Sequence, residues 1–249
     1  MKIDVTAERQ FFFATTPLPC PYLPDRLERR VLAEISGPGA PRLHDRLARA
    51  GFRRSHRVVY APACPSCNAC RALRVLVHDF EPSRTHRRLS RRNAGLLVRE
   101  LEPIATPEQY DLFGRYQRSR HGSGEMAKMD FVDYRAMVEE SSIDTRLLEV
   151  RDDARRLIAV CLVDHVSDGF SAVYSFFEPK ARRLSLGTWL ILTLIERAAV
   201  VGAQHVYLGY WVEASPKMAY KASFRPAEVY TPSGWKRLAA PAAPEPAAD

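Results

Sequence analysis

Residues 207–224 read Tyr-Leu-Gly-Tyr-Trp-Val-Glu-Ala-Ser-Pro-Lys-Met-Ala-Tyr-Lys-Ala-Ser-Phe, and our interpretation of the fold starts from this stretch. The β-branched and aromatic residues from Val206 onward are typical of a buried strand. Gly209 inside that strand predicts a bulge or the close approach of another group to the backbone. Ser215 and Pro216 favour the first turn of a helix. The stretch therefore predicts a strand that turns abruptly into a short helix.

The predicted helix presents two cations and one phenol on a single face. Lys217, Tyr220 and Lys221 share this face because residues three and four positions apart are neighbours on a helix. The strand before it contributes further aromatic side chains, which are Tyr207, Tyr210 and Trp211. Cations and hydroxyl groups beside a strand end suit a polar, anionic ligand, so we expect the functional site here.

The composition is that of a folded globular protein with an excess of positive charge. Of the 249 residues, 46% are hydrophobic and 27% are charged, which leaves room for one large or two small domains. The formal net charge of +8 favours an anionic partner, with nucleic acid as the first candidate, although moderately basic proteins are common. No secretory signal is visible, and the apolar run at 186–195 is too short to span a bilayer. We expect a cytoplasmic protein without a membrane partner.

The charge pattern predicts two domains and a tail. Arginines concentrate between residues 71 and 99, and the chain becomes far more apolar after residue 145. We place a boundary at residue 93, so that residues 1–93 form a smaller, basic, cysteine-containing domain and residues 94–238 form the second domain. Residues 239–249 are rich in alanine and proline and are expected to be disordered.

The order of predicted elements indicates an α/β (α+β) fold. In the first domain we expect a helix at 26–35, strands at 53–60 and 73–80, and a helix at 83–92 that Ser83 caps. In the second domain we expect strands at 96–98, 146–150, 157–166, 170–177, 206–208 and 228–230, and helices at 106–120, 131–140 and 186–201. This order resembles that of the GNAT-type acyltransferase fold, although function has to be argued from the site.

The cysteines form the second informative motif. Cys64, Cys67 and Cys70 are spaced so that a turn places three sulfurs around one centre, and Cys20 would complete a set of four. Such a set suits tetrahedral zinc or an iron–sulfur cluster. The alternative is a cluster of buried, reduced thiols that supports the turn. Cys161 lies in an apolar strand and is expected in the core.

The helix at 83–92 carries a strip of positive charge. Arg84, Arg87, Arg88 and Arg91 share one face and lack neighbouring acids. Arginine matches phosphate geometry well, so this face predicts salt-dependent contact with an RNA backbone. The alternative is a solvated charged surface.

Two familiar kinds of acyl-transfer chemistry lack their sequence signals. Acetyl-CoA enzymes of this fold carry a glycine-rich, phosphate-binding loop before the long helix, and here only Gly187 is left of it. The helix N-terminus could still favour an anion. No histidine occurs in a recognisable arrangement with a serine or cysteine nucleophile and an acid, so we expect no covalent acyl-enzyme.

A series of short motifs runs through nearly the whole chain. They are Phe11-Phe12, PCPYLP at 19–24, GFRRS at 51–55, Tyr60, the cysteines at 64, 67 and 70, FEPSR at 80–84, SLGT at 185–188, YLGYW at 207–211, KMAYK at 217–221 and FRP at 224–226. Together they resemble the bacterial aminoacyl-tRNA–protein transferases, in particular the aspartate/glutamate leucyltransferases, which are relatives of the eukaryotic arginyltransferases.

The resemblance implies a function. The protein would move leucine from leucyl-tRNA to the α-amine of proteins that begin with Asp or Glu, creating a destabilising N-terminus in the N-degron pathway. It implies a GNAT-like second half and no required cofactor. Eukaryotic members hold an iron–sulfur cluster with N-terminal cysteines that include a pair separated by two residues, whereas here Leu23 follows Cys20 at that spacing. The alternatives are arginyl-tRNA as donor, a GNAT N-acetyltransferase using acetyl-CoA, and a non-catalytic RNA-binding module.

The expected chemistry is transfer from an ester that is already activated. The protein would mainly hold the amine and the ester in line, with the backbone at Gly209 stabilising the oxyanion. One of Tyr207, Tyr210 and Tyr220 would pass a proton to the ribose oxygen. We expect Trp211, Lys217 and Lys221 to bind substrate, with the lysines facing the acceptor's acidic side chain. The alternatives are a surface position for the lysines, a core position for Tyr207 and a packing role for Trp211.

Overall fold

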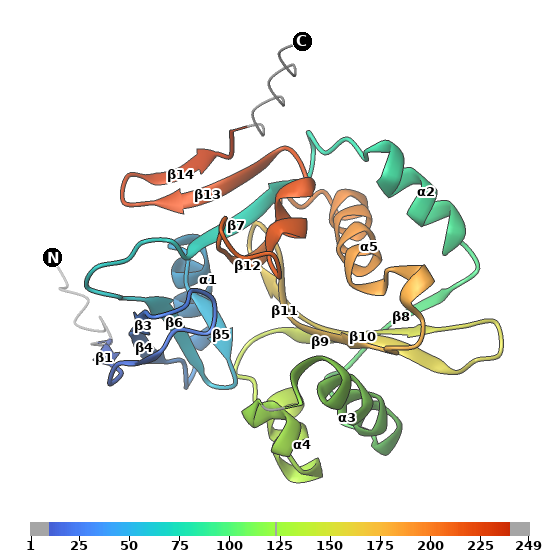
Figure 1. Cartoon of the computed structure of the whole chain (residues 1–249), viewed down its shortest axis with the longest axis horizontal. Helices are drawn as coiled ribbons and strands as arrows, with labels where there is room; N and C mark the ends of the chain where they lie inside the picture. Colours follow the sequence, from blue (N-terminus) through green and yellow to red (C-terminus); the bar gives the residue numbers. More distant parts are fainter. Residues whose placement is uncertain (1–9, 123, 240–249) are drawn as a thin grey trace, which may run out of the picture.

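The computed structural model describes residues 10–122 and 124–239, which form a four-stranded sheet, an eight-stranded sheet and a two-stranded ribbon (Figure 1). Apart from residue 239, the expected disordered tail lies outside the described residues. No helix in the described part is long and apolar enough to cross a membrane.

The smaller sheet is built by the N-terminal part of the chain. Its strand order is β1 (Phe13–Ala14), β4 (Arg30–Glu34), β6 (Val58–Pro62) and β5 (Arg53–Ser55), and helix α1 (Ala40–Arg49) packs against it. Strands β2 (Leu18–Pro19) and β3 (Leu27–Glu28) form the ribbon. The helix expected at 26–35 is wrong. Ala33 and Ile35 are buried while Glu34 between them is exposed, and this period of two suits a strand with one buried face.

The larger sheet contains the strands predicted for the second half of the chain. In spatial order they are β14 (Gly234–Arg237), β13 (Ala227–Thr231), β7 (Arg71–Leu76), β12 (His205–Trp211), β11 (Gly169–Phe177), β10 (Leu157–Val166), β9 (Thr145–Arg151) and β8 (Leu97–Leu101). Only β11 and β12 pair in parallel, because the long helix α5 (Leu186–Val200) connects them. The strands predicted for this sheet are confirmed, and β14 is an additional strand.

Helices cover both faces of the larger sheet (Figure 1). Helices α3 (Pro107–His121) and α4 (Phe131–Glu139) pack on one face, and α5 with α2 (Arg84–Arg92) on the other. The predicted helix starts are confirmed: the Ser83 side chain accepts a hydrogen bond from the His86 N–H, and Thr106 forms a capping box with Gln109. The mixed α/β class follows from these layers.

The two sheets divide the chain before the boundary that we predicted. Strand β7 and helix α2 precede residue 93, yet both belong to the larger sheet and its helical layer. The chain leaves the smaller sheet after Pro62 and enters the larger one at Arg71. The domain division at residue 93 stays a prediction.

A buried ion pair joins the smaller sheet to β10. The Nε and Nη2 atoms of Arg54 each donate to one carboxylate oxygen of Asp164 at 2.7 Å. His44 of α1 lies 3.6 Å from the same carboxylate, and burial lowers the pKa of this histidine. Because removal of one partner of such a pair leaves a buried charge, the contact fixes β5 against the larger sheet.

Candidate active site

The larger sheet opens between its two parallel strands. Strands β11 and β12 pair only from Gly169 to Ser171, opposite His205 to Tyr207. Beyond Tyr207 the register of β12 against β7 shifts, and Gly209 has a φ of +75°. The bulge that the sequence predicted at Gly209 is therefore confirmed. From this point the β11 side of β12 has no strand partner among the described residues.

The side chain of Arg53, from β5 of the smaller sheet, fills the start of this gap. Its Nη2 donates to the carbonyls of Ala172 (2.5 Å) and Val173 (3.2 Å), and its Nη1 to the Ser171 hydroxyl (3.3 Å). A Cβ on Gly209 would lie 2.6 Å from the Cζ and Nε atoms of Arg53. The close approach predicted at this glycine is confirmed, and the approaching group is a guanidinium that the sequence reasoning missed.

A cavity of about 600 Å³ opens beside Arg53. One part of its lining is apolar and consists of Met126, Met129, Met137, Leu162, Val173, Leu190, Ile191 and Leu194. The lining also includes the cations Arg53, Arg54, Lys217 and Lys221, of which Arg54 is paired with Asp164. The described lining contains no aspartate or glutamate. The cavity therefore combines apolar side chains with cationic ones.

The environment of Lys221 strongly lowers the pKa of its amine. Its Nζ donates to the carbonyl of Tyr210 at 2.7 Å. Burial, and to a lesser extent the charge of Arg53, lower the pKa of Lys221 to about 7. A lysine in this state is partly neutral at physiological pH and is able to accept a proton.

Lys217 and Tyr220 line the same cavity from more exposed positions. The helix expected from Ser215 is wrong, because the backbone first closes two turns: the Ser215 N–H donates to Val212, and the Met218 N–H to Ser215. The short 3₁₀ helix η3 begins only at Ala219 and ends at Ser223. Lys217, Tyr220 and Lys221 nevertheless come together at the cavity, as predicted.

The other predicted aromatic residues occupy different places. Tyr210 lines the cavity, and its hydroxyl lies 2.8 Å from the Tyr60 carbonyl and 3.1 Å from that of Gly51. Tyr207 does not line it, since its hydroxyl donates to Asp168 at 2.8 Å. Burial raises the pKa of both tyrosines.

Trp211 is part of the hydrophobic core, beneath the guanidinium of Arg71 at 4.9 Å. The structure does not bring Tyr207 or Trp211 to the cavity.

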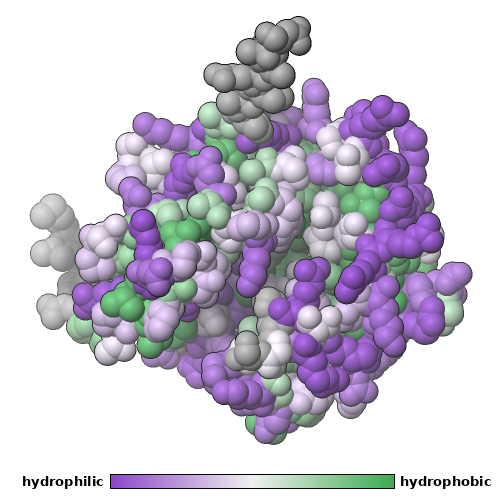
Figure 2. Space-filling model, viewed as in Figure 1, coloured by the Kyte–Doolittle hydropathy of each residue, from purple (hydrophilic) through white to green (hydrophobic). Residues whose placement is uncertain are grey.

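The four predicted RNA-binding arginines are exposed on helix α2. His86 and Leu89 form the buried side of this helix, and Arg84, Arg87, Arg88 and Arg91 lie in solvent. Figure 2 shows hydrophilic residues at the upper right of the molecule, where Figure 1 places α2. None of the four lines the cavity. A contact with nucleic acid at this surface stays a prediction.

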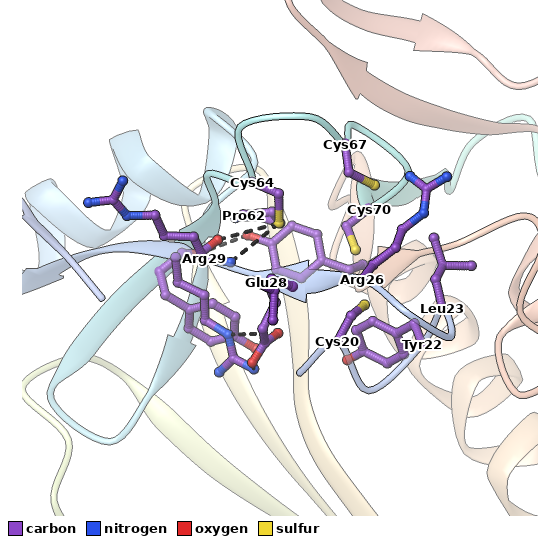
Figure 3. A pocket seen from close by; sticks show the side chains of 14 residues that line it. Cys20, Tyr22, Leu23, Arg26, Glu28, Arg29, Pro62, Cys64, Cys67 and Cys70 are labelled. Carbon is purple, nitrogen blue, oxygen red and sulfur yellow. Dashed lines mark hydrogen bonds and ion pairs between the residues drawn. The ribbon is translucent and has the colours of Figure 1, made fainter. Parts of the chain in front are cut away.

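The four predicted ligand cysteines gather around a second, smaller cavity (Figure 3). Cys20 follows β2, and Cys64, Cys67 and Cys70 come from the loop between β6 and β7. Burial and the three neighbouring cysteines raise the pKa of Cys70 to about 11. The donor set suits zinc or an iron–sulfur cluster.

Within residues 10–122 and 124–239, however, no group of three or more His, Cys, Asp or Glu side chains is arranged to hold a metal ion. The metal site stays a prediction. Cys161 is 1% exposed in the core, as expected.

Comparison with known families fixes the class of protein. The model for the N terminus of arginine-tRNA-protein transferase matches residues 18–88, and that for the C terminus matches residues 108–231. The chain belongs to the arginine-tRNA-protein transferase family. It is therefore an aminoacyltransferase, and the resemblance inferred from the short motifs is confirmed.

Two aspartate/glutamate leucyltransferases are similar to this chain over most of their length. The chain is 52% identical to the aspartate/glutamate leucyltransferase of Paramagnetospirillum magneticum, covering 92% of this chain and 94% of the relative. It is 51% identical to that of Granulibacter bethesdensis, covering 92% and 86%. A solved GCN5-related N-acetyltransferase region of a fungal enzyme overlaps 82% of this chain and 22% of that chain, at 9% identity and a TM-score of 0.41, from which no argument follows.

Proposed function

We propose that the protein transfers leucine from leucyl-tRNA to the α-amine of proteins that begin with Asp or Glu, which marks them for degradation. The observation that carries the proposal is the lining of the main cavity, which combines apolar side chains with cations and contains no described acid. The names of the relatives, aspartate/glutamate leucyltransferase, support it. The expected cytoplasmic location is compatible with such a donor and stays a prediction.

The cavity lining favours leucine over arginine as the donor side chain. Burial of a leucyl side chain against the methionines and leucines of the apolar part would contribute about 1.5–3 kcal/mol. An arginyl guanidinium would instead meet the cations Arg53, Lys217 and Lys221 in a lining without a described carboxylate, while Asp164 neutralises Arg54. A buried charge without a partner is costly. We therefore infer that arginyl-tRNA is a poor donor.

The start of helix α5 disfavours acetyl-CoA as a donor. Ser185, just before this helix, is left-handed with a φ of 45°, and its side chain makes no capping hydrogen bond. A Cβ on Gly187 would lie 3.1 Å from the Phe177 ring. The glycine is thus explained by close packing against an aromatic side chain and does not require a phosphate.

The cavity suits direct aminolysis of an ester. The acceptor's α-ammonium has to lose a proton before its nitrogen attacks the leucyl carbonyl; the C–N bond then forms, the C–O bond to ribose breaks, and the ribose oxygen takes up a proton. We assign the first proton to Lys221, whose amine is held by the Tyr210 carbonyl. The unpaired backbone of β12 beyond Tyr207 supports the developing oxyanion. After attack the nitrogen loses its second proton, and Tyr220, which lines the cavity, would pass that proton to the ribose oxygen.

Comparison of donors tests the proposal. The full chain is incubated with leucyl-tRNA, arginyl-tRNA or acetyl-CoA together with a peptide that begins with Asp, and the mass added to the peptide is measured. We expect a leucyl residue to be added from leucyl-tRNA and little or no product from the other two donors. Preferential addition of arginine or an acetyl group would overturn the proposal.

The exposed face of α2 is proposed to contact the tRNA backbone. Arg84→Gln combined with Arg88→Gln removes two exposed charges. We expect weaker tRNA binding and a slope of log affinity against log salt that is smaller by about 1.4–1.8, since each phosphate contact contributes about 0.7–0.9. Binding is measured by titration at several salt concentrations.

A matched double variant on α1, Arg42→Gln with Arg46→Gln, removes two exposed arginines at the same spacing from a different surface. It should leave the salt slope unchanged. Equal slopes for the two double variants would remove α2 from the tRNA interface.

A further inference from the structure

We propose that Arg53 is the specificity residue for the acceptor, binding the side-chain carboxylate of its N-terminal Asp or Glu in the gap between β11 and β12. The inference rests on the proposed transfer to acidic N-termini and names the group that recognises them. The inference depends on the charge of Arg53, the pairing of its neighbour Arg54, the fixed position of its side chain and the state of the two lysines in the cavity.

The positive charge of Arg53 is not neutralised within the described structure. All of its hydrogen bonds go to neutral groups, which are two carbonyls and one hydroxyl of β11. A guanidinium carries five N–H donors, so part of its bonding capacity is left over. Since a partly buried charge is costly without a counter-ion, an incoming carboxylate would be stabilised here.

Arg54, the next residue on β5, shows the opposite arrangement. Its guanidinium makes two hydrogen bonds of 2.7 Å to the buried carboxylate of Asp164. Arg54 also lines the cavity, but its charge is neutralised by Asp164. Of this pair, only Arg53 retains charge for a ligand.

The position of Arg53 is fixed before any substrate binds. The carbonyls of Ala172 and Val173 hold Nη2, and the missing side chain of Gly209 gives room to Cζ and Nε. A preorganised donor loses little conformational entropy on binding, which favours discrimination between acceptors. The same gap exposes the unpaired backbone of β12, so a carboxylate at Arg53 would bring the acceptor to the reacting groups.

The two lysines of the cavity fit the role of carboxylate reader less well. Lys221 is bonded to the Tyr210 carbonyl and, with a pKa lowered to about 7 by burial, is only partly charged at neutral pH. Lys217 is exposed, where an ion pair contributes little. We therefore revise the sequence-based expectation that these lysines recognise the acid.

The test compares two acceptor peptides that differ only in an N-terminal Asp or Asn, with leucyl-tRNA as donor. For Arg53→Met we expect kcat/KM toward the Asp peptide to fall about 10- to 100-fold, mainly through KM, the size expected for a hydrogen bond to a charged group. The Asn peptide should change by less than about threefold, because it lacks the charge. Arg53→Lys should restore part of the preference for Asp.

Arg57→Met is the matched control. Arg57 is an exposed arginine in the same hairpin, and its nearest carboxylate oxygen, on Glu34, is 3.7 Å away. The Arg57→Met variant should keep the wild-type kcat/KM with the Asp peptide and with the Asn peptide, and so their ratio. If Arg53→Met does not fold, as judged by thermal melting, Arg53→Gln replaces it, because the amide can still donate to the carbonyls of β11 but carries no charge.

The outcomes separate this inference from the proposed function. If the wild-type protein transfers no leucine to either peptide, the proposed function fails. If the wild-type protein does transfer leucine, an unchanged Asp-to-Asn ratio in the folded Met or Gln variant overturns the role of Arg53. An equal loss with both peptides overturns it as well, because Arg53 would then only hold the strands apart.

Discussion

Replacement of Gly209 by alanine is expected to remove nearly all leucyl transfer while the protein stays folded. The new Cβ would lie 2.6 Å from the Cζ of Arg53, so the guanidinium has to leave its place beside the carbonyls of β11. A displacement of about 1 Å in a site of this kind can cost about 100-fold in rate, and we expect a loss of about that size in kcat/KM, the upper end of the range for Arg53→Met. Initial rates with leucyl-tRNA and an Asp peptide measure it.

Gly202→Ala separates the steric effect from backbone strain. Gly202 has a φ of +72°, close to the +75° of Gly209, but a Cβ there meets nothing within 4 Å. A non-glycine residue in this left-handed region costs about 1–2 kcal/mol at either position. We expect Gly202→Ala to lower the melting temperature and to keep the transfer rate. Similar activities in the two variants would contradict the role of Gly209.

Local features of this site were predictable from the sequence. Gly209 interrupts a run of strand-forming residues, and the structure shows both the bulge and the close contact. Ser83 and Thr106 are cap residues whose hydrogen bonds reach only three positions along the chain. Each of these signals depends on neighbouring residues, which is why these features could be predicted from the sequence.

The distant partners of the site could not be derived. Arg53 meets its β11 partners across 118 to 120 residues of sequence, and nothing in the pair Arg53-Arg54 shows which side chain a carboxylate neutralises. The motif GFRRS at 51–55 was part of the family resemblance, and the structure gives its two arginines different roles. At Ser215 the sequence has the residues of a helix start, but the structure has turns. The Ser215 N–H bonds the Val212 carbonyl and the Met218 N–H bonds the Ser215 carbonyl, so no α-helix begins there.

Lys221→Met is expected to slow transfer and to change its dependence on pH. In the wild-type protein the amine of Lys221 becomes a proton acceptor as the pH rises through its pKa of about 7, so the rate should rise there and then level off. General base catalysis contributes about 100- to 10,000-fold, and we expect a loss of that order in kcat.

In the Lys221→Met variant the remaining rise should move to the pKa of the acceptor's own amine, about 8. Single-turnover rates between pH 5.5 and 9 measure the shift. A variant that keeps the wild-type profile would exclude Lys221 as the base.

The same half-buried lysine should make stability depend on pH in a defined direction. Burial lowers its pKa from 10.5 to about 7 in the folded state, so between these values the unfolded chain binds a proton that the folded chain does not. The free energy of unfolding therefore rises with pH across this window, by at most about 1.4 kcal/mol per pH unit, and below pH 7 the folded state carries the full cost of a buried charge.

Lys221→Met should thus be more stable than the wild type at pH 6, with the difference shrinking toward pH 10. Urea denaturation of both proteins at the two pH values measures this, with the exposed Lys236→Met as a control that should show no such trend. A stability difference between Lys221→Met and wild type that is the same at both pH values would mean that Lys221 stays charged in the folded protein, and its assignment as the proton acceptor would then have to be abandoned.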